Sequence, residues 1–363
     1  MRTPAFVRRF RFFGILTVVS VYLLILVGGI VRSTGSGMGC PDWPKCFGTW
    51  VPPTDISQLP ADYKEVYTAQ RVAKNKRLAT TLERFGFRQV ASNIFAHPTQ
   101  YIETDFNPVK TWIEYVNRLI GALIGIFVFL TVVLAWPYWR RDRPVFWLAF
   151  WAFILTGVQG WLGSLVVSTN LLPIMITVHM GLALLIVAML IYAVERSQRA
   201  TVPTERNSEV MPITTGIAGW LWLIVLLTFG QIVLGTQVRE QVDLVATANS
   251  YLQRGTWIEQ LGSIFAVHRT FSAVLLLLNA YVLYQVYQQP NRRLQRWATA
   301  VVVLIVLEIL AGVTLAYFSL PAIVQPVHLT LGTLLFGAQF ILLLTYRHAR
   351  KTVGQATFPR VVA

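Results

Sequence analysis

Apolar residues form eight long runs along this chain, and basic or polar connections separate them. A helix of about 20 apolar residues is long enough to cross the hydrocarbon core of a bilayer. Every run reaches that length, so the pattern predicts an all-α integral membrane protein with eight transmembrane helices. The predicted helices span residues 12–31, 112–136, 145–167, 171–194, 213–238, 264–286, 297–318 and 321–346.

The composition excludes a soluble globular protein, because 55% of the 363 residues are hydrophobic and only 13% are charged. A formal net charge of +15 would favour a nucleic-acid partner if the basic residues formed one patch. Instead they gather in alternate connections, at 2–11, 140–143, 196–206, 292–296 and 347–360. The positive-inside rule therefore predicts that both termini are cytoplasmic. Because the charge follows the topology, we expect no nucleic-acid partner. We expect a multi-pass protein of a bacterial-type inner membrane.

The long segment 32–111 is predicted to lie outside the cytoplasm. It carries ten Lys or Arg residues, but long translocated loops are largely exempt from the charge rule. It also contains both cysteines of the chain, Cys40 and Cys46, and disulfides persist in oxidising compartments. The pair is interpreted as a structural disulfide, a dithiol that cycles between oxidation states, or a pair of metal ligands. The sequence leaves these three roles open.

Two further parts of this segment have a predicted conformation. The glycine-rich run 35–39 follows a membrane helix and leads into the cysteine loop, so we expect a flexible turn and no nucleotide-binding loop. Residues 61–85 have the pattern of a basic amphipathic helix, with Tyr63, Val66 and Tyr67 among Lys and Arg. Such a helix lies on the outer surface of the membrane, caps the helical bundle, or is a solvated insertion.

Two matching motifs divide the chain into halves. Q-G-W-L-G at Gln159 is followed by His179 after 15 residues, and E-I-L-A-G at Glu308 is followed by His328 at the same spacing. The repeat predicts two tandem four-helix bundles, related by a pseudo-twofold axis along the membrane normal. The predicted units are 1–194 with the outer loop 32–111, a cytoplasmic linker 195–212, a second half 213–346 and a cytoplasmic tail 347–363.

A second match concerns polar residues one or two turns from the outer helix ends. Asn117 and His268 open the second and sixth predicted helices, so Asn117 would face His179 and His268 would face His328 across a bundle. Paired histidines on membrane helices are the axial ligands that haem iron takes. A single membrane histidine often only hydrogen-bonds a neighbouring helix. Three of them in a shared register favour a functional role.

Each of these helices continues with an arginine, Arg118 or Arg269. A guanidinium can hold a haem propionate through two hydrogen bonds. The alternative is an ordinary arginine at a helix end that extends its side chain to water. Arg32 and Arg239 occupy matching places at the ends of the first and fifth helices and are weaker candidates for propionate binding.

The two halves differ at positions that predict a division of roles. Glu114 lies one turn before Asn117, whereas Phe265 has that place in the second half. A carboxylate beside one haem only could move a proton or stabilise a developing charge. Two histidines saturate an iron for electron transfer, whereas the Asn117 side leaves one position open. Glu308 is expected to hydrogen-bond a neighbouring helix, with a proton path as the alternative.

The run G-G-I-V-R-S-T-G-S-G-M-G-C-P-D-W-P-K-C that ends at Cys46, the E-Y-V-N-R segment that begins at Glu114 and the three helix histidines resemble the haem A synthase family. The resemblance covers the eight-helix chain apart from much of the insertion at 48–111. It implies a membrane oxidoreductase that converts haem o to haem a for cytochrome oxidase. Successive hydroxylations of the C8 methyl group would give a gem-diol, which loses water to form the formyl group.

The resemblance also implies roles for individual residues. His268 and His328 match the pair that holds a prosthetic haem b, and this haem would carry electrons. His179 matches a ligand in the site for haem o, the substrate. Glu114 matches the family's functionally important carboxylate.

The resemblance extends to the outer cysteines, but one ligand position differs from the family pattern. Cys40 and Cys46 match the family's outer-loop pair, which is linked to reductant transfer or to formation of the active enzyme. The chain departs from the family pattern at Asn117, where many members have histidine, and an amide is a poor iron ligand. The loop 239–262 also lacks the second cysteine pair of some members, so any dithiol chemistry rests on the first pair alone.

The implied partners are membrane lipid, haem o and haem a, an upstream haem o synthase, and an electron donor that the sequence does not name. The sequence leaves a homo-oligomer open. A diheme b-type electron-transfer subunit would also explain paired ligands, but not Glu114 beside a half-empty axial pair. A transporter built from parallel repeats would explain the duplication, but its binding site is expected near the bilayer midplane.

Overall fold

The computed structural model describes residues 3–95, 103, 105–169, 171–199 and 216–357. Regular structure in these ranges is helical, apart from an isolated bridge between Cys46 and Thr49. The α-helices are α1 (Ala5–Ser33), α2 (Tyr63–Arg84), α3 (Arg88–Ile94), α4 (Pro108–Ala135), α5 (Arg143–Ser168), α6 (Pro173–Arg199), α7 (Ile217–Ala248), α8 (Ser263–Tyr287), α9 (Arg292–Tyr317) and α10 (Val324–Thr357).

Eight of the described helices, α1 and α4 to α10, are long and apolar enough to cross a membrane. This confirms the predicted all-α membrane fold with eight spans. Two helices continue well past their predicted ends: α7 is predicted to end at residue 238 but continues to Ala248, and α10 is predicted to end at residue 346 but continues into the predicted tail as far as Thr357. Arg239 and Asp243 form an ion pair of 2.8 Å one turn apart on the continued part of α7. Polar residues therefore extend this helix beyond its apolar run.

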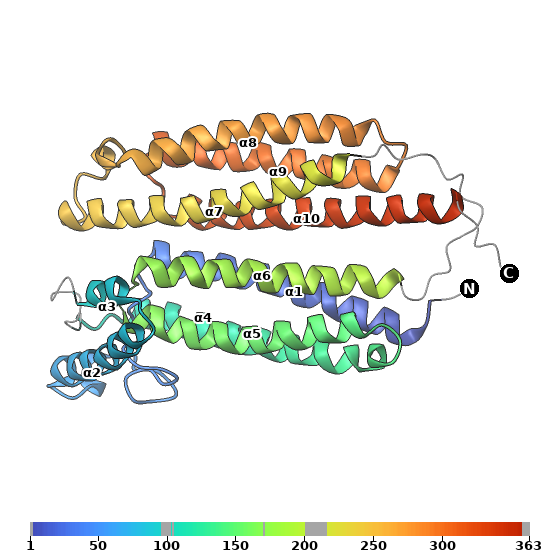
Figure 1. The fold of residues 1–363 in the computed structure, drawn as a ribbon. Helices are drawn as coiled ribbons and strands as arrows, with labels where there is room; N and C mark the ends of the chain where they lie inside the picture. Colours follow the sequence, from blue (N-terminus) through green and yellow to red (C-terminus); the bar gives the residue numbers. More distant parts are fainter. Residues whose placement is uncertain (1–2, 96–102, 104, 170, 200–215, 358–363) are drawn as a thin grey trace.

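The membrane helices pack as two rings of four (Figure 1). In the first ring, α1, α4, α5 and α6 each pack against two neighbours, and α7, α8, α9 and α10 do the same in the second. The rings meet where α10 packs against α1 and α6, and where α6 packs against α7. Consequently α4 lies diagonally across from α6, and α8 from α10. The pseudo-twofold relation between the halves stays a prediction.

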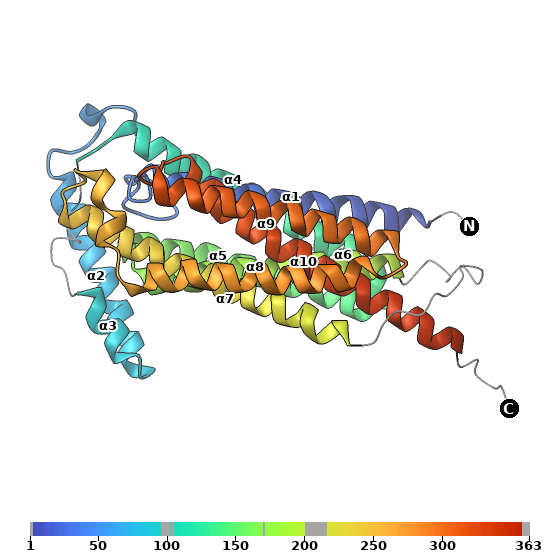
Figure 2. The ribbon, with the colours of Figure 1, turned by 90° about the horizontal axis from the view of Figure 1, so that it is seen from above.

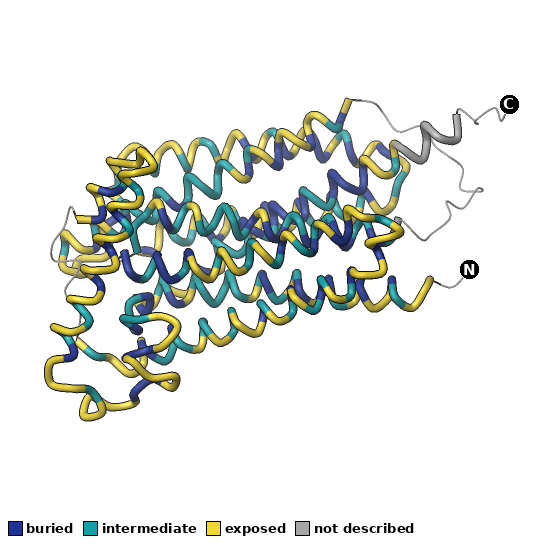
Figure 3. The backbone as a smooth tube through the Cα atoms, turned by 60° about the horizontal axis from the view of Figure 1, so that its bottom comes forward, coloured by how far each residue is buried: buried dark blue, intermediate teal, exposed yellow. Residues whose placement is uncertain are grey.

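The tightest apolar packing lies away from the predicted haem positions. Leu221, Val282, Ala298 and Leu342 are fully buried in one cluster of the second ring, toward the end where α7 begins. Figure 3 shows how buried segments recur along the facing sides of the helices. The three helix histidines lie toward the opposite end and are only half-buried.

The start of α1 and the end of α10 lie at one end of the bundle, and α2 and α3 lie at the other (Figure 1). This arrangement is expected for an even number of crossings, and the cytoplasmic location of the termini stays a prediction. α6 continues to Arg199, so residues 195–199 of the predicted linker are helical. The linker residues 200–212 and the tail residues 358–363 lie outside the described residues.

The glycine-rich run before the cysteine loop is packed, which differs from the expected flexible turn. Gly35 has a φ of 65°, a left-handed conformation that favours glycine. A Cβ at Gly39 would lie 2.6 Å from the backbone oxygen of Lys110, so only glycine fits against the start of α4. Ser36, between the two glycines, is fully buried. The pattern revealed the turn but not its contact with a segment distant in the sequence.

The predicted basic helix at 61–85 is confirmed as α2, with ends that differ by one or two residues. Of the three placements considered for it, the structure shows contact with the bundle, because α2 packs against α5. Asn75 of α2 is fully buried and donates a hydrogen bond of 2.8 Å to the backbone oxygen of Ser168, the last residue of α5.

Candidate functional site

Each of the three helix histidines packs against a glycine on the helix that precedes it. The pairs are Gly163 with His179, Gly235 with His268, and Gly312 with His328. A Cβ on these glycines would lie 3.4–3.7 Å from Cε1 of the paired ring, so a larger side chain would press against the ring. The glycines thus leave room for the imidazoles in the ring interior.

Two glutamines fix the backbone at the histidine positions. Gln159 donates a hydrogen bond of 2.8 Å to the backbone oxygen of His179, and Gln231 donates one of 2.9 Å to that of His268. The sequence motif paired Gln159 with Glu308 and missed Gln231. A signal was present, because Gln231 precedes Gly235 by four residues, the same spacing as in the other two helices.

Glu308 differs from these glutamines in its contact. Its Oε1 lies 3.2 Å from Nδ1 of His328, on the neighbouring helix α10. The carboxylate therefore lies against a neighbouring helix, but Nδ1 of His328 has no hydrogen-bond partner among the described residues, so the expected hydrogen bond and the alternative proton path both stay predictions. A carboxylate beside Nδ1 orients an imidazole and raises its basicity, and it leaves Nε2 free for a metal.

The ring geometry places the predicted ligand positions on diagonal helices. Asn117 on α4 and His179 on α6 belong to the first ring, and His268 on α8 and His328 on α10 belong to the second. Diagonal helices are separated by the bundle core, so a group between them would be held from two sides. The iron-ligand roles of these residues stay predictions.

The residues present fit a haem better than a bare metal ion. In the described part of the chain, no three His, Cys, Asp or Glu side chains lie close enough together to hold an ion. A haem needs only two axial ligands from the protein, because its macrocycle supplies four nitrogens. Nδ1 of His179, Nδ1 of His268 and Oδ1 of Asn117 are buried, and none has a hydrogen-bond partner among the described residues. Unpaired polar atoms of this kind indicate a place for a ligand.

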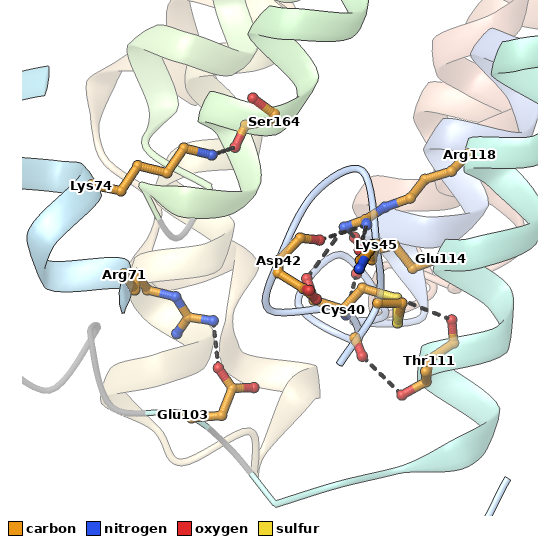
Figure 4. Close-up of polar contacts among 12 residues, drawn as sticks. Cys40, Asp42, Lys45, Arg71, Lys74, Glu103, Thr111, Glu114, Arg118 and Ser164 are labelled. Carbon is orange, nitrogen blue, oxygen red and sulfur yellow. Dashed lines mark hydrogen bonds and ion pairs between the residues drawn. A yellow bond between two sulfur atoms is a disulfide. The ribbon is translucent and has the colours of Figure 1, made fainter. Parts of the chain in front are cut away.

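Glu114 is held at the end of the first ring that carries the cysteine loop (Figure 4). Its side chain is buried, with 3% of the residue exposed. Oε2 accepts a hydrogen bond of 2.9 Å from the backbone N–H of Cys40, and Oε1 accepts one of 2.5 Å from Arg118. The structure therefore joins the predicted carboxylate to the cysteine loop, a contact that spacing along one helix could not reveal.

Arg118 binds the same loop through its backbone. It donates hydrogen bonds of 2.7 Å and 2.9 Å to the carbonyl oxygens of Asp42 and Lys45, and one of 3.2 Å to that of Cys40 (Figure 4). The sequence considered a haem propionate or water as its partner, and it missed these carbonyl groups. Propionate binding stays a prediction for Arg118.

Cys40 and Cys46 form a disulfide, and both residues are fully buried. This excludes the metal-ligand interpretation of the pair and leaves the structural and redox roles open. Thr111 at the start of α4 donates a hydrogen bond of 2.8 Å to the backbone oxygen of Gly39. Lys74 of α2 lies near enough to Arg118 to be affected by its charge: burial and the positive charge of Arg118 lower the pKa of the Lys74 amino group.

The second ring lacks this arrangement. Phe265 occupies the register of Glu114, and the exposed guanidinium of Arg269 lies 5.9 Å from the Phe265 ring. Arg32 and Arg239, the weaker propionate candidates, share the carboxylate of Asp243 at 2.8 Å each, across the boundary between the rings. The two ring mouths therefore differ in charge as well as in ligand type.

Comparisons with known proteins agree with the sequence motifs. The family model COX15-CtaA, described as cytochrome oxidase assembly protein, matches residues 11–97 and 87–340. A heme A synthase of Bradyrhizobium sp. (strain ORS 278) is 25% identical over 366 residues, covering 94% of this chain and 91% of that protein. One of Alkalihalophilus pseudofirmus is 22% identical over 342 residues, covering 91% and 95%.

A shorter match is to a heme A synthase of Shewanella oneidensis, 25% identical over 250 residues. It covers 68% of this chain and 62% of that protein. The family model, in contrast, extends over nearly all eight membrane helices. The chain therefore belongs to the COX15-CtaA family of cytochrome oxidase assembly proteins, which confirms the resemblance indicated by its motifs.

Proposed function

We propose that this protein is a haem A synthase, a membrane oxidoreductase that converts the C8 methyl group of haem o to the formyl group of haem a. The observation that carries the proposal is the difference between the two rings. Among the described residues, only the first ring has a buried carboxylate at its mouth, Glu114, and this ring offers one histidine. Relatives that bear the name heme A synthase match over more than nine-tenths of the chain.

The substrate haem is assigned to the first ring, with His179 as its iron ligand. Asn117, Gly121 and Gly125 recur every four residues on α4 and therefore share one face of that helix. A Cβ at either glycine would meet nothing within 4 Å, and both residues are only half-buried. This face offers a flat surface to a macrocycle, and the amide of Asn117 leaves the iron open on that side.

A haem b is assigned to the second ring, between His268 and His328. When bound, it would supply one-electron transfer to the substrate site. Gly235 and Gly312 make room for the two imidazoles. The carboxylate of Glu308, 3.2 Å from Nδ1 of His328, would favour the tautomer with the proton on Nδ1 and leave Nε2 to bind the iron.

Glu114 is assigned the charged role in the oxidation. Cys40 N–H and Arg118 hold its carboxylate in a site that protein atoms shield from water. A fixed negative charge in low dielectric stabilises positive charge that develops at the oxidised carbon, or accepts a proton from it. Each of the two hydroxylations would take O₂ as the oxidant: one oxygen atom enters the C–OH group, and the other leaves as water with two electrons from the donor and two protons. Loss of water from the gem-diol then gives the aldehyde.

The proposed setting is a bacterial-type inner membrane with both termini in the cytoplasm. The histidine positions and Glu114 then lie near the outer face, at the end where α2 and α3 are found. Haem o would come from an upstream haem o synthase, and a separate donor would supply electrons. A diheme electron-transfer subunit is the alternative function.

Co-expression with a haem o source tests the proposal. Extracted haems are separated by chromatography, and the purified protein is examined by visible spectroscopy. We expect haem a to accumulate with the native protein. In His268→Ala and His328→Ala variants we expect the b-type spectrum to disappear. A protein that binds b-type haem but never forms haem a would be the electron-transfer subunit, and the proposal would fail.

A further inference from the structure

The hairpin formed by α2 and α3 projects sideways from the bundle. Figure 2 shows it at the end opposite the start of α1, where it crosses the long axis of the bundle and extends past its side. Figure 1 places the same hairpin beyond the ends of α5 and α6. A segment in this position overhangs the lipid that surrounds the membrane helices. Its location does not depend on any haem chemistry.

The hairpin is fixed to the bundle by polar and apolar contacts. Besides the bond from Asn75 to Ser168, Lys74 reaches the backbone oxygen of Ser164 at 3.4 Å (Figure 4). The small apolar core of the hairpin, with Ala79, Ala91 and Ile94, packs against Leu172 just before α6. The overhang is therefore held at a defined depth.

A tryptophan on α5 indicates that depth. Trp161 is 55% exposed and lies three residues before Ser164, roughly 4.5 Å along the helix at 1.5 Å per residue. Exposed tryptophans of membrane helices concentrate at the membrane–water interface, at the level of the lipid headgroups. The hairpin contacts α5 between Ser164 and Ser168, in the last turns of this helix, and the end of a spanning helix is where it meets the headgroups.

The tip of the hairpin is apolar and exposed. Phe85 is 75% exposed and Phe87 is 58% exposed, with Gly86 between them at a φ of 87°. Two exposed phenylalanine side chains at one turn are unfavourable in water but suit the membrane interface. Arg84 and Arg88 flank the turn on either side.

The hairpin as a whole is basic, and two of its arginines lie at the tip. Residues 63–94 contain seven Lys or Arg and two Glu. Arg84 and Arg88 line an open groove of about 740 Å³ between α2 and α3, with Gln89 and Ser92 as further hydrogen-bond donors. A guanidinium pair binds phosphate oxygens through paired hydrogen bonds, and basic segments at the interface bind anionic lipids. Glu83 also lines the groove and opposes a free anion.

We propose that the α2–α3 hairpin rests on the outer leaflet, with Phe85 and Phe87 inserted among the headgroups and Arg84 and Arg88 bound to the phosphate of an anionic phospholipid. The hairpin would then connect the membrane surface to the start of α4. Arg71 of α2 forms a buried ion pair of 2.6 Å with Glu103 (Figure 4). Tyr63 accepts a hydrogen bond from the N–H of Phe106.

Insertion is tested on the full chain in lipid nanodiscs with Phe85→Cys carrying an environment-sensitive fluorophore. The native cysteines are joined, so the new thiol is labelled alone. Nitroxide on lipid chains near the headgroup should quench this label several-fold more than a label at Tyr251→Cys. Tyr251 is 72% exposed and follows the outer end of α7. Equal quenching at the two sites, or free access of iodide to the Phe85 label, would overturn the proposal.

The phosphate contact is tested by the lipid dependence of the same signal. Raising the phosphatidylglycerol fraction in phosphatidylcholine discs should increase quenching, and Arg84→Gln with Arg88→Gln should remove this increase. Arg292→Gln with Arg296→Gln makes the same charge change at the opposite end and should keep it. Quenching that does not change with the fraction of anionic lipid would contradict a bound lipid headgroup. Quenching that inorganic phosphate added to the solution abolishes would contradict it too. Circular dichroism checks that each variant remains helical.

Discussion

The backbone N–H of Cys40 donates a hydrogen bond of 2.9 Å to the carboxylate of Glu114. The disulfide loop and the proposed catalytic carboxylate are therefore one structural unit, although 73 residues separate them in the chain. Arg118 completes the unit, because it binds Glu114 and three loop carbonyls at once. Changes in the loop should reach the carboxylate without any contact to haem.

Glu114→Gln should abolish most of the oxidation while the protein keeps its haem b. The amide preserves the shape and can still accept from Cys40 N–H, but it has neither the negative charge nor a carboxylate base. Loss of a positioned acid or base costs about 10²–10⁴-fold in rate. The ratio of haem a to haem o in extracted membranes measures the effect. Glu83→Gln, in the outer hairpin, is the control, and undiminished turnover of Glu114→Gln would remove this residue from the chemistry.

Arg118→Lys should loosen the cysteine loop although it keeps the positive charge. An ammonium group cannot reproduce the planar fork that reaches carbonyl oxygens of Asp42, Lys45 and Cys40 together. We expect the Cys40–Cys46 disulfide to be reduced several-fold faster, as measured by thiol labelling after timed exposure to a reductant. Arg269→Lys, at the matching register of the second ring, should leave the rate unchanged. If both variants behave like the native protein, Arg118 does not secure the loop.

Gly312→Val should weaken haem b binding. The new side chain would start from a Cβ only 3.4 Å from Cε1 of His328, so its methyl groups would displace the ring. Overpacking of this kind costs about 1–3 kcal/mol, or roughly 5- to 150-fold in affinity for haem, which lowers occupancy at limiting haem. Haem content per protein measures it. Gly219→Val is the control, because a Cβ there meets nothing within 4 Å. A full haem b content in Gly312→Val would contradict the assigned site.

Glu308→Gln should shift the midpoint potential of the haem b. The carboxylate beside Nδ1 of His328 gives the imidazole anionic character, which favours the oxidised iron. An amide removes that charge, so we expect a more positive potential in a redox titration followed by visible absorption. Gln159→Glu, the reciprocal change in the first ring, should leave this potential where it is. An unchanged potential in Glu308→Gln would show that the 3.2 Å contact does not tune the ligand.

The membrane fold could be predicted from the sequence because the bilayer sets the length of each apolar run. The end of α7 could not, since the ion pair between Arg239 and Asp243 continues the helix in polar sequence. For the site, repeated spacing pointed to the histidines, and the departure from the repeat at Phe265 pointed to Glu114, while the roles of these residues stay predictions. The contacts of Gly39 and Arg118 depend on how the loop folds back on α4, which no local pattern encodes. Gln231 is different, because its spacing to Gly235 repeats a pattern already visible in the sequence.

Asn117→His should close the first ring around its haem. Asn117 and His179 stand on diagonal helices, and Oδ1 of Asn117 is buried without a hydrogen-bond partner among the described residues. An imidazole there would provide a second strong axial ligand, as at His268 and His328.

The haem iron of the haem o-loaded Asn117→His variant should then become six-coordinate and low-spin. Electron paramagnetic resonance would detect this change. Asn117→Gln is the matched control, because it keeps the amide and should keep the native spectrum. A low-spin substrate haem in the native protein would already show that another group fills the position opposite His179. In that case the open coordination site assigned to the first ring would be wrong, while the assignment of haem b to the second ring would stand.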